Sequence, residues 1–188
     1  QFVAERNLGA VRSIAAVVHY ACWSHAIDLI HHLAGPVATV TALQGREKHQ
    51  GAGIDAVDKA CAFLTREGAT GTLLGTSGID FGFPLFDLRF NYERGQIRLR
   101  CLDDDLELFD YARKSQERYA IPRDKSRWNQ YDASFVKAIG AYLESIRKNA
   151  APPVPGLAGL QELQFEAALC RSTSERRWVE PQVEFPLS

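Results

Sequence analysis

The chain has 188 residues, of which 46% are hydrophobic and 24% are charged, and its formal net charge is −1. These values fit one globular domain with a buried core, and the near-zero charge gives no electrostatic reason to expect nucleic acid or an anionic membrane as a partner. There is no signal peptide and no apolar run long enough to span a bilayer, so we expect a cytoplasmic protein with no membrane partner. The cysteines lack paired spacing, which favours reduced thiols over disulfides or a zinc site; they are Cys22, Cys61, Cys101 and Cys170.

In chain order, the first predicted element is a β-strand over 11–20, which is rich in β-branched residues. A short helix follows, because Ser24 can cap its first turn and Gly35 with Pro36 can end it. The alternation over 37–43 predicts a second strand.

The polar, glycine-bearing segment 45–53 predicts a loop. Segment 58–76 has both helical and alternating spacing of its apolar residues. The glycines near its middle favour a hairpin between strands over 59–66 and 70–76.

The next segments predict an antiparallel pair with one buried face, because apolar residues alternate over 86–90 and again over 97–101. An acidic triplet, 103–105, predicts a solvated turn rather than a cation site. A short strand over 106–109 follows, and the charged segment 111–131 predicts irregular structure.

Two helices are predicted near the end of the chain. Asp132 can cap the first, and a proline-rich linker over 150–156 leads to the second, over 157–173, before a last short strand at 178–180. Hairpin-connected strands with helices predict an α+β domain over 1–188, with a mostly antiparallel, open-faced sheet and helices packed on one face. The apolar face of the first of these helices consists of Phe135, Val136, Ile139, Tyr142, Leu143 and Ile146.

The helix after Ser24 carries the candidate chemistry. His25, Asp28 and His32 are spaced at i, i+3 and i+7, so their side chains lie on one face. An imidazole with a carboxylate one turn away can act as a proton-transfer pair, although a helical histidine is more often a structural or surface residue. We expect no metal site, because three consecutive turns splay the side-chain tips apart. We expect no cofactor-binding residues, because the chain has no glycine-rich phosphate motif.

Several ordered motifs resemble the Gfo/Idh/MocA oxidoreductases, relatives of glucose–fructose oxidoreductase and inositol dehydrogenase. The resemblance covers residues 10–181, and it supports strands rather than a helix over 60–76. The motifs are Ser24-His25-Ala26-Ile27-Asp28-Leu29, Leu33-Ala34-Gly35-Pro36-Val37, Glu67-Gly68-Ala69 with Gly71-Thr72-Leu73, Phe135-Val136 with Ala138-Ile139, Pro152-Pro153-Val154, Gly159-Leu160, Ala167-Ala168 and Trp178-Val179.

The resemblance implies a nucleotide-binding Rossmann domain followed by an α+β sheet domain, of which this chain is the second. The absence of methionine and the start at Gln1 also predict that an N-terminal portion precedes it. The implied partners are a sugar or polyol substrate and a second copy of the chain, joined through the open sheet face. NAD or NADP is implied only through the Rossmann domain, which this chain lacks.

The resemblance also implies a site. His25 matches the histidine that handles the proton, and Asp28 matches the aspartate three residues on. Ala21 stands where the family has an aspartate four residues before the histidine, so the orienting carboxylate is missing. His19, Tyr20 and Trp23 are, with Asp28, candidate neighbours of the substrate pocket.

Two functions remain open, and enzymatic activity is uncertain at this point. The chain is either the substrate-side and oligomerisation half of an NAD(P)-dependent oxidoreductase acting on a sugar or cyclitol-like alcohol, or a catalytically inactive member of the fold used for binding or oligomerisation. Membership of a fold does not by itself establish catalysis.

Overall fold

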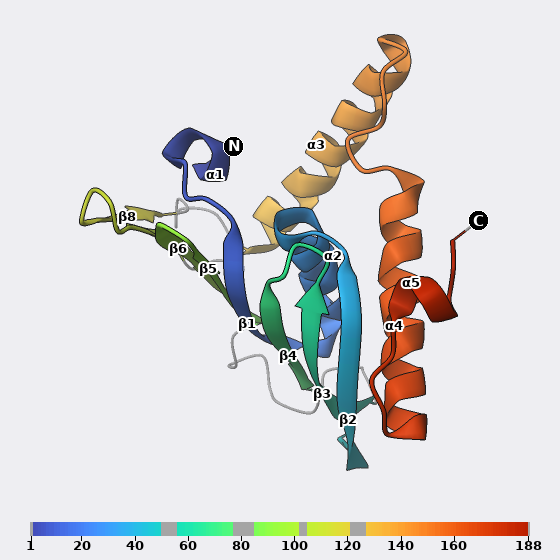
Figure 1. Ribbon diagram of the computed structural model, residues 1–188. Coiled ribbons are helices and arrows are strands. Elements are labelled where there is room, and N and C mark those ends of the chain that lie inside the picture. The colour runs from blue at the N-terminus through green and yellow to red at the C-terminus, as the bar shows by residue number, and fades with distance from the viewer. Residues whose placement is uncertain (1, 50–55, 77–84, 102–104, 121–126, 188) are drawn as a thin grey trace.

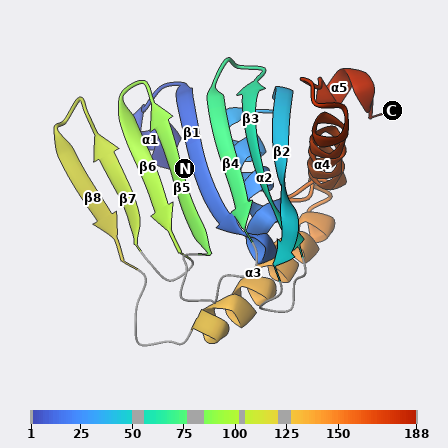
Figure 2. The same ribbon diagram turned by 90° about the horizontal axis from the view of Figure 1, so that it is seen from below.

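A computed structural model describes residues 2–49, 56–76, 85–101, 105–120 and 127–187. One eight-stranded sheet lies at the centre, and the helices α2, α3 and α4 lie on one side of it (Figures 1 and 2). The elements in chain order are α1 (Phe2–Arg6), β1 (Val11–His19), the 3₁₀ turn η1 (Tyr20–Cys22), α2 (Trp23–Ala34), β2 (Val37–His49), β3 (Ala56–Thr65), β4 (Thr70–Thr76), β5 (Phe86–Tyr92), β6 (Gly95–Arg100), β7 (Leu106–Asp110), β8 (Ser115–Tyr119), α3 (Arg127–Arg147), α4 (Gly156–Glu175) and α5 (Pro181–Glu184).

The sheet is mixed, which corrects the expectation of a mostly antiparallel sheet. Its strand order is β2-β3-β4-β1-β5-β6-β7-β8, and β1 pairs in parallel with β4, with Ser13 opposite Thr70. The parallel pair arises because β1 leads through η1 and α2 to β2, and the chain then folds back twice, so that β4 returns beside β1 in the same direction. Parallel strands require a crossover of this kind, usually through a helix.

The core lies between the sheet and the helices. Alternate residues of β5 point toward it, so Phe86, Leu88 and Phe90 are buried. From the helix side, α2 buries Ile30 and α4 buries Phe165. Figure 2 shows α2 beneath β1 and its neighbours and α4 beside β2. This half of the sheet is therefore covered on one face, and its other face is open.

Most predicted strands are confirmed, including the β3–β4 hairpin and the β5–β6 pair. The predicted loop over 45–53 is wrong in its first part, because β2 continues to His49. The predicted irregular segment 111–131 contains β8, a polar edge strand without an apolar alternation. The last predicted strand is reduced to a single bridge between Val40 and Val179. Residues 50–53, 103–104 and 121–126 of these predictions lie outside the described residues.

Two predicted helix caps are wrong. The helix α2 begins at Trp23, so Ser24 lies inside it, and the N-cap position belongs to Cys22. Asp132 lies inside α3, which begins at Arg127. The predicted end of α2 is confirmed: Gly35 has φ 79°, a left-handed backbone conformation that favours glycine, and its N–H donates to the His31 carbonyl.

The outer edge of β2 is covered over its first half, from Val37 to Ala42. Val40 and Val179 exchange two backbone hydrogen bonds of 2.9 Å each, and the Ala42 N–H donates to Oγ of Ser172 on α4 at 2.9 Å. The opposite edge strand, β8, is only five residues long. None of the described helices is both long and apolar enough to cross a membrane.

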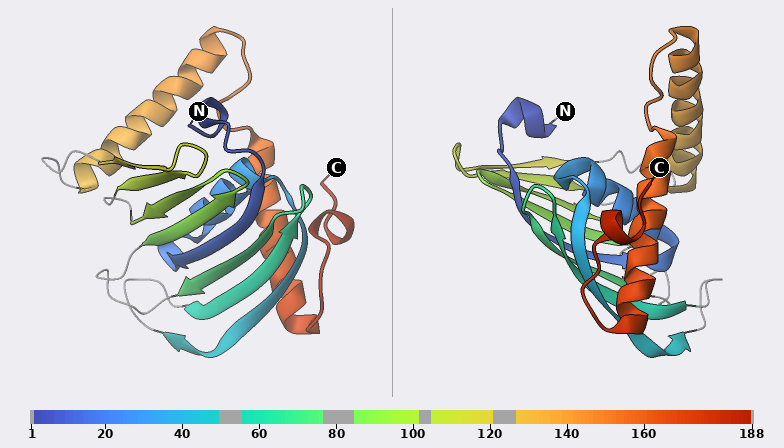
Figure 3. Two further views of the ribbon diagram at one scale, coloured as in Figure 1. Left: turned by 60° about the vertical axis from the view of Figure 1, so that its left-hand side comes forward. Right: turned by 45° about the vertical axis from the view of Figure 1, so that its right-hand side comes forward.

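Helix α3 departs from the expectation that the helices pack on the sheet. It projects away from the rest of the molecule on the helix side (Figure 3), and its large apolar side chains are exposed. The predicted amphipathic pattern is present, but its apolar face is not buried against the described residues.

Candidate active site

The candidate site lies at the start of α2. The apolar side of this helix is buried through Ala26, Ile27 and Ile30, which face the sheet. The opposite side is consequently exposed, and it presents His25 and Asp28 to solvent. The helix period alone explains this division, because residues three and four apart share a face.

His25 is exposed in the first turn of α2, and none of the described residues hydrogen-bonds to its side chain. His32 is also exposed, two turns further along the helix. The imidazole of His25 is therefore accessible to a ligand or to another domain from the outer side of α2.

Asp28 lies near two groups that the sequence did not connect with it. Burial lowers the pKa of His31, and the negative charge of Asp28 opposes that shift. Burial also raises the pKa of Glu162 on α4, and the charges of Glu166 and Asp28 add to this effect. The structure thus places Asp28 within the electrostatic reach of α4 as well as on the face that carries His25.

His19 lies at the buried end of β1, with 1% of its surface exposed. Its Nδ1 accepts the N–H of Ala21 at 3.1 Å and so caps η1. This bond fixes the turn that leads from β1 into α2. The side chain of Ala21 itself is exposed and small.

Tyr20 and Trp23 belong to a network that anchors the start of α2. Their rings stack with centroids 5.3 Å apart, and the Trp23 indole lies over Gly75, where a β-carbon would overlap it. The indole Nε1 donates to Oε2 of Glu166 at 2.8 Å, and Oε1 of Glu166 pairs with Nζ of Lys59 at 2.5 Å. Burial, with the nearby Glu166 charge, raises the pKa of the Tyr20 phenol.

Sequence reasoning missed Glu166 and Lys59, which are 143 and 36 positions from Trp23. One signal was available for Glu166: its neighbours Phe165, Ala168 and Leu169 form the buried side of α4, so a carboxylate beside them needs a partner.

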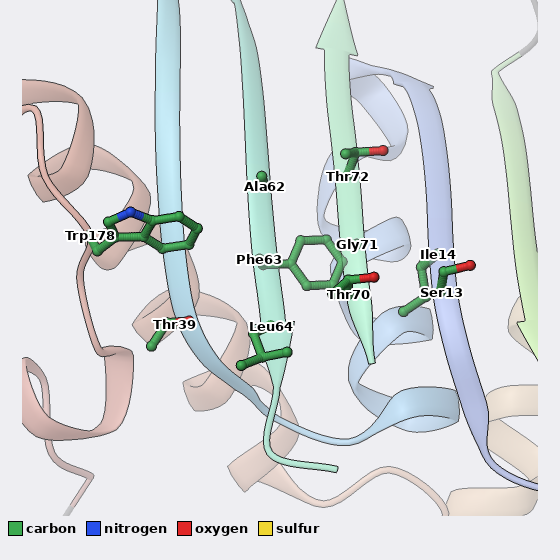
Figure 4. A pocket seen from close by; sticks show the side chains of 10 residues that line it. All are labelled: Ser13, Ile14, Thr39, Ala62, Phe63, Leu64, Thr70, Gly71, Thr72 and Trp178. Atoms are coloured by element: carbon green, nitrogen blue, oxygen red, sulfur yellow. The ribbon is translucent and has the colours of Figure 1, made fainter. Parts of the chain in front are cut away.

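A second surface feature lies on the open face of the sheet (Figure 4). It is a hollow of about 600 Å³, with Trp178 beside it. Threonine and serine hydroxyls and small side chains from β1 to β4 form much of its lining, which consists of Ser13, Ile14, Thr39, Ala62, Phe63, Leu64, Thr70, Gly71, Thr72 and Trp178.

In the part of the chain that the structure describes, no group of three or more His, Cys, Asp or Glu side chains is placed to hold a metal ion. The described residues also lack a phosphate cradle. Among the described residues, β1 and β4 are the parallel pair, and the crossover between them begins with the step from β1 into α2. The first residue of α2 is the buried Trp23, and this turn has no glycine that would let a phosphate approach the backbone N–H groups.

Comparison with known protein families shows to which family the chain belongs. The protein-family model described as "Oxidoreductase family, C-terminal alpha/beta domain", that of Gfo/Idh/MocA proteins, matches residues 12–180. The chain belongs to the Gfo/Idh/MocA oxidoreductase family. Within this family, it corresponds to the C-terminal alpha/beta domain.

Solved structures share the fold at low sequence identity. An oxidoreductase from Agrobacterium radiobacter, in complex with NAD+, L-tartaric acid and magnesium, is 16% identical with a TM-score of 0.76, and the match covers 98% of this chain and 61% of that one. Levoglucosan dehydrogenase in complex with NADH and levoglucosan is 12% identical with a TM-score of 0.77, covering 95% and 61%. The WlbA dehydrogenase from Bordetella pertussis, with NADH and UDP-GlcNAcA, is 19% identical with a TM-score of 0.67, covering 99% and 60%.

The chain thus spans about three fifths of the length of these neighbours. A search of curated proteins finds no significant match.

Proposed function

We propose that this chain is the substrate-side and oligomerisation domain of an NAD(P)-dependent oxidoreductase that acts on a sugar or cyclitol-like alcohol. The observation that carries the proposal is His25, an accessible imidazole in the first turn of a helix whose start is anchored by Glu166. Family membership supports it, as do the names of the neighbours, which pair NAD+ or NADH with a sugar derivative or a hydroxy acid.

In this proposal, His25 takes the proton of the substrate hydroxyl when an alcohol is oxidised and returns it in the reverse direction. When bound, a nicotinamide accepts the hydride from the carbinol carbon. His19, Tyr20 and Trp23 remain predicted neighbours of the substrate. Their contacts fix the turn η1 and the start of α2, which is the part of the helix that carries His25. Asp28 stays the predicted partner of His25.

The nicotinamide cofactor has to come from outside the described residues. They offer no glycine-rich turn for a pyrophosphate, and the side chain at the start of α2 fills the space against Gly75. We therefore propose that a separate nucleotide-binding domain holds NAD or NADP and that the described residues contribute the substrate side.

The second candidate function is a catalytically inactive binding or oligomerisation module. Ala21 favours it, because a methyl group cannot orient the imidazole of His25 as a carboxylate would.

For self-association, we propose the open sheet face as the contact between two copies. On that face Leu43 of β2 is 76% exposed, and Trp178, next to the outer edge of β2, is 59% exposed. Leu64 and Leu74 are also exposed there, on β3 and β4. Exposed apolar residues gathered on one face are typical of a protein–protein interface.

The experiment is an assay of the intact gene product with NAD+ and NADP+ across sugars, cyclitols and nucleotide sugars, comparing His25→Ala with His32→Ala. We expect His25→Ala to lower turnover at least about 10²-fold, because it removes the proton acceptor, and His32→Ala to leave it nearly unchanged. If the wild type oxidises an alcohol and the His25→Ala variant does so at the same rate, His25 has no role in the mechanism. No turnover with any alcohol would favour the inactive module, and light scattering on the same sample would then test self-association.

A further inference from the structure

Helix α3 carries a large group of exposed apolar side chains. Eight of its large apolar side chains are between 47% and 73% exposed, and Ser145 is the single residue of the helix that is buried among those whose side chains are described. The eight are Trp128, Tyr131, Phe135, Val136, Ile139, Tyr142, Leu143 and Ile146.

Six of these residues form one continuous stripe, which we name the α3 face. Their spacings of three and four positions keep them on one side of the helix, and the rings of Trp128, Tyr131 and Phe135 contact one another in sequence, with centroids 6.1 and 4.9 Å apart. The α3 face consists of Trp128, Tyr131, Phe135, Ile139, Tyr142 and Ile146.

A helix with this exposed face needs a partner. Most of the stability of a helix in a protein comes from the packing of its apolar face, and an exposed stripe of six large apolar side chains marks an interaction surface. The described residues do not bury the α3 face, so the partner lies outside them.

The position of α3 indicates which partner this is. Helices α2 and α3 lie on the same side of the sheet in every view, whereas the face proposed for self-association is on the other side (Figures 1, 2 and 3). If His25 exchanges a proton with a substrate hydroxyl, the hydride acceptor must contact the adjacent carbon. The domain that carries the nicotinamide must then approach from the side on which α2 and α3 lie.

We propose that the α3 face docks the nucleotide-binding domain that delivers the nicotinamide to the His25 site. This inference rests on the proposed function. It assigns the two unpartnered apolar surfaces to two different occupants: the α3 face binds the cofactor domain, and the open sheet face binds a second copy.

The test is hydrogen exchange of the intact gene product, followed by mass spectrometry, with Ile139→Glu and Phe135→Glu on the α3 face. Ala141→Glu is the matched control, because Ala141 is exposed on the opposite side of the same helix. We expect wild-type α3 amides to exchange about as slowly as those of α4, and each variant on the α3 face to speed α3 exchange at least tenfold without changing α4. Ala141→Glu is expected to leave α3 slow. In an active enzyme, the same two variants should lower kcat at least tenfold with little change in the affinity for NADH, which the other domain holds.

Three results would overturn the proposal. They are α3 amides that exchange fast in the wild type, protection of α3 that disappears on dilution and so reports a second copy, and a gene product with no nucleotide-binding domain. A protected α3 in a protein that oxidises no alcohol would leave the docking proposal standing and refute the catalytic function alone.

Discussion

Helices α3 and α4 are nearly equal in length, 21 and 20 residues, yet they differ in what they contact. The helix α4 buries Phe165, Ala168 and Leu169 against the sheet, whereas the α3 face is exposed although its apolar stripe is the more regular. An amphipathic pattern therefore predicts that a helix needs a partner and does not identify that partner. What joins α4 to the sheet is a set of specific contacts, among them the hydrogen bonds of Ser172 and Glu166.

The two helices should differ most in how much stability is lost when a large apolar side chain is replaced by alanine. Phe165 is 2% exposed and contacts Phe63 and His31 edge to face, so Phe165→Ala should destabilise the chain by about 3–5 kcal/mol. Phe135 is half exposed, so Phe135→Ala should change the stability of the 188-residue chain by less than about 0.5 kcal/mol. Urea unfolding measures both, and equal losses would show that α3 packs as α4 does.

A smaller loss is expected when the polar contact of α4 is removed. The Ser172 hydroxyl accepts from the Ala42 N–H and donates to the Arg177 carbonyl at 2.6 Å, and Ser172 is fully buried. Ser172→Ala leaves both groups unsatisfied and should cost about 1–3 kcal/mol in unfolding free energy. The control is Ser174→Ala, an exposed residue of the same helix, which is expected to cost less than about 0.5 kcal/mol. If Ser172→Ala lowers the unfolding free energy no more than the control does, the Ser172 hydrogen bonds do not stabilise the packing of α4.

The smallest effect concerns charge at the C-terminal end of α4. Hydrogen bonds from Arg177 and Arg171 lower the pKa of Glu184 to about 2, from an ordinary value of 4.5. Because the folded-state pKa is the lower one, the stabilisation is complete above pH 4.5 and is lost as the pH falls toward 2.

We therefore expect Glu184→Gln to flatten the fall of the melting temperature between these two pH values. Glu144→Gln serves as the control, since Glu144 pairs with Arg147 and Lys148 inside α3 alone. A Glu184→Gln curve that runs parallel to the wild type would contradict the assigned pKa.

Local signals in the sequence predicted much of the fold. The β5–β6 pair and the exposed face with His25 and Asp28 follow from periods of two and 3.6 residues, which are local properties. The parallel pairing of Ser13 with Thr70 depends on how distant segments return to one another, which no local pattern encodes. The strand β8 was missed because an edge strand with two polar faces has no apolar alternation.

The candidate site also has one part that local patterns predict and one part that they do not. The placement of His25 on the outer side of α2 could be predicted, because its helix neighbours Ala26 and Ile27 are apolar. The anchor of α2 could not, since Trp23 and Glu166 are 143 positions apart.

The covered edge of β2 has a consequence for how copies of the chain can grow into an assembly. Val179 and Ser172 already bind the outward backbone groups of Val40 and Ala42, so an incoming strand finds no free template there. At the other edge, β8 is short and carries Glu117 and Arg118. These contacts oppose the growth of a filament by strand addition along residues 37–42 of β2, and the short, charged β8 opposes it at the other edge of the sheet. The association proposed through the open sheet face would instead be closed by a twofold axis and would stop at a finite particle.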